Sequence, residues 1–419
     1  MTSSASHRAI EAVWRIESAR LIASLTRMVG DLSLAEDFAQ DALLAAMEKW
    51  PESGLPDNPG AWLMTAAKRR AIDHLRRDKR LDRKHEELGA ALVELERTSP
   101  DLDTALDDRV GDDLLRLMFI ACHPVLSTEA RVALTLRLLG GLTTEEIARA
   151  FLAPVPTIAQ RIVRAKRTLA EARVPFEVPR TDQLTARVGA VLEVIYLVFN
   201  EGYSATSGED WIRPTLCDEA LRLGRILAGL MPEEPEVHGL VALLELQASR
   251  LRTRVTSSGE PVLLADQDRL RWDRLLIQRG LASLERAIRP GSGLGNYGLQ
   301  AAIAACHARA TSIEETDWTR IAALYDGLAQ ISPSPVVELN RAVAYSQAFG
   351  PAAGLEILEP LRGDPALESY HLLPAVRADF LAKLGRRDEA RAELRVAAQL
   401  TSNEKERRLL EDRASRLGS

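Results

Sequence analysis

The sequence contains few aromatic residues and few cysteines. Of its 419 residues, 5% are aromatic and three are cysteine. Cys122, Cys217 and Cys306 lie far apart, without the spacing of metal ligands and without the even number that a disulfide framework needs. No two of the seven histidines have ligand spacing either, so we predict no metal and no cofactor. We therefore expect a protein of a reducing compartment, with no disulfides.

Long apolar runs are also missing. The first residues lack the charged start and apolar run of a secretory signal. The most apolar stretch, residues 188–199, is interrupted by Glu193 and is too short to span a bilayer. We expect a soluble, cytoplasmic protein with no membrane partner.

An overall basic charge is the third feature that is missing. The chain has 54 Lys and Arg against 60 Asp and Glu, which gives a net charge of -6. Any affinity for DNA must therefore come from local basic patches. The length predicts two or three domains, and 46% hydrophobic residues are enough to form their cores.

Residues 141–173 predict a helix-turn-helix, around which the chain is organised. Within residues 142–146 a Thr is followed three residues later by a Glu, which is typical of a capping box at the start of a helix. Pro154 and Pro156 break that helix, because proline lacks an amide hydrogen and disfavours helical geometry in the preceding residue. We expect Thr157 to start the second helix as its N-cap.

The second helix has two different faces. The apolar face, expected to pack inward, comprises Ile158, Ile162, Ala165 and Leu169. The other face has side chains suited to base edges in a major groove, with Arg matching guanine and Gln matching adenine: Thr157, Gln160, Arg161, Arg164 and Thr168. Lys166 and Arg167 flank this face and are expected to hold phosphates. The alternative is an ordinary helical hairpin with a solvated basic face.

Two further helices are predicted before this motif. Residues 9–49 show helical periodicity, with an apolar set that includes Ile10, Ile16 and Leu25. Their second half has an acidic outer face formed by Glu36, Asp37, Gln40 and Asp41. This face is either simply solvated or binds a partner with a basic surface.

A loop over residues 51–58 and a basic helix follow. Asn58 is a plausible N-cap with Pro59 at the first helical position. The helix packs Trp62 and Leu63 inward and carries a run of basic residues suited to phosphate backbones, although a solvated face is an equally good interpretation. Its polar side chains include Lys68, Arg69, Arg70, Asp73, Arg76 and Arg77.

An acidic segment then separates the two basic modules, and its charge is expected to keep it off nucleic acid. We predict a first domain over residues 1–80, an acidic linker over residues 81–112, a helix-turn-helix domain over residues 113–175 and a helical extension over residues 176–419.

Residues 9–173 resemble a bacterial sigma factor of the extracytoplasmic-function group, which keeps two conserved domains. The resemblance implies two partners, core RNA polymerase and promoter DNA. It assigns polymerase binding to Asp37, Gln40 and Asp41, and upstream-box recognition to the helix with Thr157, Gln160, Arg161, Arg164, Lys166 and Arg167. It assigns downstream-box recognition and strand opening to Asn58, Trp62, Lys68, Arg69, Arg70, Asp73, Arg76 and Arg77.

The last hundred or so residues of the extension resemble tetratricopeptide repeats. Two segments align with Gly350 over Gly385, a step of 35 residues, close to the repeat period of about 34. Stacked helix pairs of this kind form a groove for a protein or peptide partner. The whole chain is thus expected to be all-α, with two small sigma domains followed by a helical-repeat domain.

Three stretches with polar or glycine-rich composition suggest catalysis only weakly. Residues 200–204 are expected to cap and turn the chain, Trp272 within the charged segment 267–273 is expected to pack, and the glycines of residues 291–298 lack the strand and Lys-Ser/Thr of a phosphate loop. Nothing pairs a nucleophile with a base, so we predict that the protein is not an enzyme.

The favoured function is an alternative sigma factor whose extension regulates activity or docks a partner. Two alternatives stay open at this point: a helix-turn-helix regulator that does not join polymerase, and a scaffold in which the repeat-like half is the main interaction module.

Overall fold

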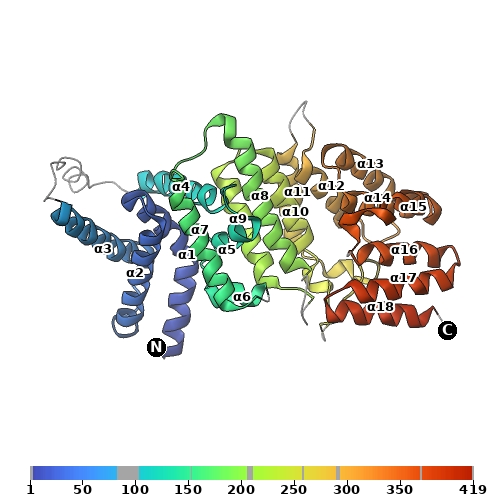
Figure 1. Ribbon diagram of the computed structural model, residues 1–419, viewed down its shortest axis with the longest axis horizontal. Coiled ribbons are helices and arrows are strands. Elements are labelled where there is room, and N and C mark those ends of the chain that lie inside the picture. Colours follow the sequence, from blue (N-terminus) through green and yellow to red (C-terminus); the bar gives the residue numbers. More distant parts are fainter. Residues whose placement is uncertain are drawn as a thin grey trace. The chain divides into compact units, whose positions relative to one another are not determined.

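The computed structural model describes residues 3–82, 103–151, 153–204, 211–256, 259–288, 293–368 and 370–417. Within these ranges the chain forms eighteen α-helices and five short 3-10 helices and no strand (Figure 1), which confirms the all-α prediction. It divides into two compact units, Met1–Val194 and Ile195–Ser419. The division falls inside helix α8 (Thr181–Tyr203), beyond the predicted boundary at residue 175.

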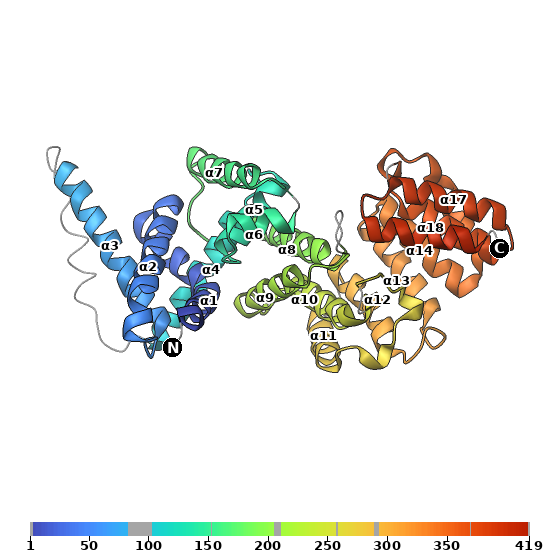
Figure 2. The same ribbon diagram turned by 90° about the horizontal axis from the view of Figure 1, so that it is seen from below.

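The first three helices are α1 (Ser3–Val29), α2 (Leu32–Ser53) and α3 (Pro59–Asp82), and they pack side by side (Figure 2). Small residues on α2 and α3 allow close packing against the larger apolar side chains of α1. The buried set comprises Leu21, Ile22, Leu25, Ala39, Ala42, Leu63, Ala67 and Ala71. Ile16, a member of the apolar set that predicts this helix, is 62% exposed, because it shares the outer face of α1 with Arg20 and Arg27.

The predicted loop is shorter than residues 51–58. Helix α2 continues through Pro51 to Ser53, so only residues 54–58 connect it to α3. Pro51 lies in the last turn of α2, and the helix ends two residues after it. Asn58 caps α3 as predicted, with its Oδ1 accepting from the backbone N–H of Ala61 at 3.0 Å.

The remaining helices of the first unit are α4 (Asp103–Ala121), α5 (Thr128–Leu138), α6 (Thr144–Ala150), α7 (Val155–Glu171) and the start of α8. Residues 103–112, predicted as linker, are helical, whereas the predicted linker residues 83–102 lie outside the described part of the chain. Asp113, at the end of the acidic segment, is 1% exposed and forms ion pairs with Arg27 and Arg116, both at 2.8 Å. Its carboxylate is thus a buried anion that pairs with both arginines.

The second unit continues from α8 through α9 (Pro214–Leu230), α10 (Pro235–Ala248), α11 (Arg274–Ala287) and α12 (Asn296–Arg309). Three 3-10 helices lie between α10 and α11: η1 (Leu251–Thr253), η2 (Leu264–Asp266) and η3 (Arg269–Arg271). Helix α10 is buried on all sides from residue 237 to residue 246 and packs against α9, α11 and α12. It is therefore the centre of this part of the fold.

The chain ends in helical pairs. They are formed by α13 (Trp318–Ile331), α14 (Pro335–Phe349), α15 (Pro351–Leu358), η4 (Glu359–Gly363), η5 (Pro365–Leu367), α16 (Leu372–Lys383), α17 (Arg387–Leu400) and α18 (Glu404–Arg416). Gly350 and Gly385 occupy the same position in two successive pairs, between the two helices, with φ of 96° and 78°. The predicted alignment thus matches two helical hairpins, while their tetratricopeptide-like character stays a prediction.

The three stretches set aside as catalytic candidates have structural roles. Glu201 forms a buried ion pair with Arg213, and Trp272 is 3% exposed. In the glycine-rich stretch, the N–H groups of Tyr297 and Gly298 donate to Glu236, so these amides are already occupied. The three cysteines are unpaired and buried. None of the described helices combines the length and the apolar character that crossing a membrane would require.

Candidate nucleic-acid interface

Helix α7 has the two faces that its sequence predicts. Ile158, Ile162, Ala165 and Leu169 are all buried, since they form the stripe that packs against α5 and α6. The helix begins at Val155, three residues earlier than expected, with Pro154 at its N-cap position. The prediction that Thr157 caps the helix was therefore wrong: Thr157 lies within its first turn, because Pro156 fits the start of a helix without needing an amide partner.

Helix α6 is capped by the predicted box. The N–H of Glu146 donates to Thr143 Oγ1 at 3.1 Å, and the N–H of Thr143 donates to Glu146 Oε2 at 2.8 Å. Ile147 and Ala148 are buried beneath α7. This cap fixes the first helix of the motif and thereby the angle at which α7 is held.

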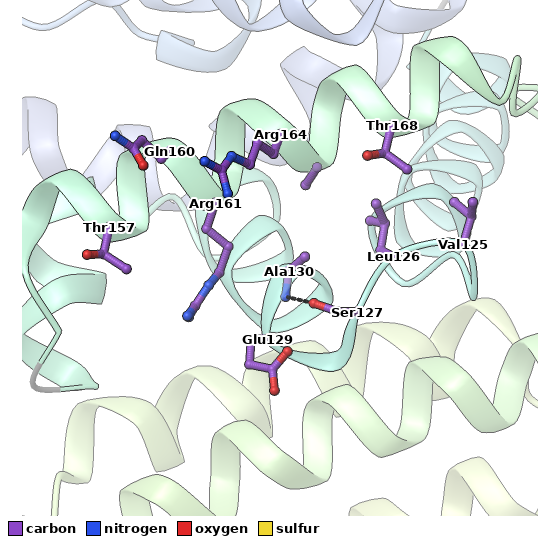
Figure 3. A pocket seen from close by; sticks show the side chains of 11 residues that line it. Val125, Leu126, Ser127, Glu129, Ala130, Thr157, Gln160, Arg161, Arg164 and Thr168 are labelled. Atoms are coloured by element: carbon purple, nitrogen blue, oxygen red, sulfur yellow. Dashed lines mark hydrogen bonds between the residues drawn. The ribbon is translucent and has the colours of Figure 1, made fainter.

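A groove of about 460 Å³ runs along the exposed face of α7 (Figure 3). Its other wall is formed by residues 125–130, which include the N-terminal end of α5. The predicted base-reading residues all line it: Thr157, Gln160, Arg161, Arg164 and Thr168. The structure thus brings them together on one open surface.

The members of this face differ in their surroundings. Figure 3 shows Arg161 extending toward Glu129, while Gln160 and Arg164 lie along the helix. The pKa of Glu129 is lowered, first by a hydrogen bond from its own backbone N–H, then by the Ser127 hydroxyl and the charge of Arg161. Arg161 therefore faces an ionised carboxylate, and Thr157, Gln160 and Arg164 are the exposed members of this face.

The two flanking cations have different positions. Arg167 is on the surface, paired with Glu171 at 2.6 Å. Lys166 points inward and forms an ion pair with Glu36 of α2, which leaves its side chain 17% exposed. In this arrangement Lys166 is not placed to hold a phosphate, because its ammonium already has an internal carboxylate partner.

Glu36 is the buried centre of the contact between α2 and the helix-turn-helix. It is 4% exposed, and its Oε1 accepts from Arg137 Nε at 2.7 Å and from Gln40 Nε2 at 3.0 Å. Its Oε2 accepts from Lys166 Nζ. Burial raises the pKa of Glu36, but the charges and hydrogen bonds of Lys166 and Arg137 outweigh burial and leave the pKa below its ordinary value.

Two further ion pairs join the same modules. Arg15 of α1 contacts Glu146 of α6 at 2.8 Å, and Arg27 of α1 contacts Asp113 of α4 at 2.8 Å. The first domain and the helix-turn-helix domain are therefore packed together within one unit. The sequence analysis expected two modules held apart by the acidic linker.

The basic helix α3 presents only part of its predicted set. Arg69, Arg70, Asp73 and Arg76 are exposed, with Arg70 paired to Asp41 at 2.8 Å. Lys68 is half-buried, and burial together with the charge of Arg27 lowers its pKa. The side chain of Arg77 lies outside the described residues.

Asn58 and Trp62, the two other residues assigned to the downstream promoter box, have structural contacts. The Asn58 side chain caps α3. Trp62 is half-buried, with its ring 5.3 Å from that of Trp50 in an edge-to-face arrangement. Trp62 is therefore partly engaged in packing, and its other side remains accessible.

The acidic face of α2 includes apolar residues that the sequence analysis missed. Asp37 is exposed, and Gln40 and Asp41 are half-buried. Leu44, at 56% exposure, and Met47, at 40%, continue this face. Leu44 follows Gln40 by four residues and Asp41 by three, so helical spacing alone could have placed it there.

No group of three or more His, Cys, Asp or Glu side chains in the described part of the chain could hold a metal ion. The geometry is that of a charged helical surface, with a groove along α7 and an acidic and apolar face on α2.

Family models match three segments of the chain. Residues 15–81 match sigma-70 region 2, residues 116–169 match sigma-70 region 4, and residues 187–288 match a family of unknown function (DUF6596).

Relatives of the whole chain and of part of it are known. The chain is 44% identical over 388 residues to the uncharacterized protein R00370 of Rhizobium meliloti (strain 1021), covering 91% of this chain and 90% of that one. It is 30% identical over 173 residues to the probable ECF RNA polymerase sigma factor SigI of Mycobacterium tuberculosis (strain ATCC 25618 / H37Rv), covering 41% of this chain and 58% of SigI. It is 29% identical over 158 residues to the ECF RNA polymerase sigma factor SigK of Mycobacterium sp. (strain KMS), covering 37% of this chain and 77% of SigK.

Replacing Glu36 by Gln should destabilise the contact between α2 and α7. The substitution leaves Lys166 and Arg137 without their anion, and we expect the free energy of opening to fall by about 2 kcal/mol, less than for a fully buried pair because both cations keep some contact with water. Hydrogen-exchange mass spectrometry of peptides from α2 and α7 measures this. Glu48→Gln, an exposed change on the same helix, is the control, and equal exchange in the two variants would contradict the prediction.

The effect of Glu36→Gln should also depend on pH. Since the folded-state pKa of Glu36 lies below its ordinary value of 4.5, the ionised carboxylate contributes its full stability above that pH and loses it as the pH falls through the lowered pKa. The difference in unfolding free energy between wild type and Glu36→Gln should therefore shrink on acidification below about pH 4. Urea denaturation at a series of pH values tests this, and a difference independent of pH would count against it.

Proposed function

The chain belongs to the sigma-70 family, in its extracytoplasmic-function group, with a helical C-terminal extension, and on this premise we propose how its N-terminal modules engage polymerase and promoter. It is an alternative sigma factor that directs core RNA polymerase to promoters. The match to region 2 over residues 15–81 argues against a regulator that does not join polymerase, because such a regulator needs no region of that kind.

The groove face of α7 recognises the upstream promoter box. The observation that carries this assignment is the separation of its faces: the apolar stripe is fully buried, and Gln160 and Arg164 are exposed on the open side. Gln suits the N6 and N7 edge of adenine and Arg the O6 and N7 edge of guanine. Arg161 contributes after turning from Glu129.

The exposed cations of α3 hold the downstream box. Arg69 and Arg76 lie on the outer surface of α3, and Arg70 lies beside the acidic face of α2. Such side chains bind backbone phosphates, while the accessible side of Trp62 stacks on an unpaired base. The loop of residues 54–58, fixed by the Asn58 cap, directly precedes the helix that carries them.

The outer face of α2 binds core RNA polymerase. Asp37 and Asp41 supply charge, and Leu44 and Met47 supply apolar area that would otherwise stay in water. An interface needs such a desolvated apolar centre with a polar rim. Glu36 is on the inward side of the same helix and takes no part.

The contact between the modules opens when the promoter is bound. Two separate boxes on one duplex cannot be contacted together by modules that are packed against each other, so the ion pairs of Glu36 break and Lys166 becomes available for phosphate. We propose a cytoplasmic location, since core RNA polymerase and promoter DNA are the partners, and we assign the extension to regulation or to docking of a partner. A truncation that tests this should keep α8, because Arg187 donates to the carbonyl of Phe119 at 2.6 Å.

Arg164→Ala should relax the base preference at one upstream position and cost about 1–3 kcal/mol on the preferred sequence. Selection from a library of randomised upstream boxes with reconstituted holoenzyme measures this. Arg167→Ala is the comparison, since the loss of a phosphate contact weakens binding to all sequences alike. A uniform loss for Arg164→Ala, with an unchanged preferred sequence, would refute base recognition by this residue.

The combined change Asp37→Asn and Leu44→Ala should weaken binding to core RNA polymerase at least tenfold, which corresponds to about 1.4 kcal/mol. Fluorescence anisotropy of the labelled chain titrated with purified core enzyme measures the affinity. Lys49→Ala, an exposed change on another side of α2, should leave it unaltered. Wild-type affinity in the double variant would remove this face from the interface.

A further inference from the structure

Helix α10, the most enclosed helix of the second unit, contains two glutamates with different surroundings. Glu236 accepts from the N–H groups of Tyr297 and Gly298 and so caps α12. Glu245 is 3% exposed, and its Oε1 accepts from Arg225 Nε at 3.0 Å and contacts Nη2 at 2.9 Å. Its Oε2 is equally buried and has no hydrogen-bond partner among the described residues. An unsatisfied buried carboxylate oxygen is costly and needs a physical explanation.

Glu245 forms part of the floor of a groove between α9, α10 and α11. The groove has a volume of about 480 Å³, within the range of small-molecule sites. Small residues keep it open, among them Gly229 and Ala282. The polar side chains that line it come from all three helices: Arg225, His238, Glu245, Arg279, Ser283 and Arg286.

The groove has an excess of positive charge. Three guanidinium groups, those of Arg225, Arg279 and Arg286, surround the single carboxylate of Glu245. Neither Arg279 nor Arg286 forms an ion pair with an acidic side chain in the described part of the chain, and both are exposed. They lie seven residues apart, on one face of α11. A guanidinium group binds carboxylates and phosphates well, because its N–H donors match their oxygens in pairs.

Burial raises the pKa of Glu245, and the hydrogen bond and charge of Arg225, with the charges of Arg279 and Arg286, offset this only in part. An additional hydrogen-bond donor would therefore stabilise the ionised carboxylate of Glu245 beyond what its present partners do.

We propose that this groove binds a small anionic metabolite that carries an N–H or O–H donor near its phosphate or carboxylate group. Arg279 and Arg286 hold the anionic group, and Glu245 Oε2 accepts from the donor. A small molecule fits better than a peptide, because the groove has the volume of a small-molecule site. The site lies within residues 187–288, for which the family match assigns no function, and it does not depend on the promoter contacts proposed above.

Isothermal titration calorimetry of the full-length chain tests the proposal with four probes. Guanosine 5′-monophosphate and L-glutamate combine an anion with a donor, sulfate is an anion without one, and an acidic peptide represents a protein partner. We expect at least one of the first two probes to bind at least tenfold more tightly than sulfate. The preferred probe then distinguishes a phosphate ligand from a carboxylate ligand.

Substitutions in the groove test whether the probes bind there. Arg279→Ala combined with Arg286→Ala should weaken the binding of all anions at least tenfold. Glu245→Gln should abolish the preference for the donor-carrying probe over sulfate, while sulfate still binds. Ala282→Trp blocks the groove at its surface without altering the buried floor, so it tests the site even if Glu245→Gln fails to fold. Arg274→Ala, exposed on α11 outside the groove, is the matched control and should bind as wild type.

Four outcomes would overturn the proposal: neither small probe binds, sulfate binds as tightly as both, only the acidic peptide binds, or the Ala282→Trp and double arginine variants bind as the wild type does.

Discussion

The first unit depends on one buried carboxylate. Glu36 connects α2 to both α5 and α7, and all its partners are cations or amide donors. Burying an ion pair costs desolvation energy that its attraction only roughly offsets, so the cluster contributes specificity more than net stability. It determines that α2 and α7 pack in one register, since a shift of either helix would leave a charge buried without its partner.

This register decides which faces remain available. Because Glu36 turns toward α7, the opposite side of α2 presents Asp37, Asp41 and Leu44 to solvent. The apolar stripe of α7, packed against α5 and α6, keeps Gln160 and Arg164 on the open side of that helix, while Lys166 turns toward Glu36. The Glu36 contact therefore joins the inward sides of α2 and α7 and leaves two external surfaces, one acidic and apolar, the other suited to DNA.

The sequence predicts what local spacing determines. The inward stripe of α7, the capping box of α6 and the Asn58 cap were all predicted correctly, since each depends on residues within one or two helical turns. The inward roles of Glu36 and Lys166 were not, because their partners lie 101 and 130 residues away and a charged residue has the same local pattern whether it is solvated or paired. Asp113 is a similar case, with a partner 86 residues away. Contacts between distant parts of the chain therefore determine which residues of a charged helix face are exposed.

Glu36 and Glu245, two of the buried glutamates in the described part of the chain, show how to separate a structural charge from an acceptor that needs a ligand. Both Glu36 and Glu245 are less than 5% exposed and both contact arginine. Both oxygens of Glu36 are bonded and its pKa is lowered, so the fold itself provides complete solvation. Only one oxygen of Glu245 is bonded and its pKa is raised, so the fold leaves its solvation incomplete, in a groove that is also lined by Arg279 and Arg286. Burial and partner type are alike at the two sites. The free acceptor oxygen of Glu245 is the reason why we assign that site to a ligand.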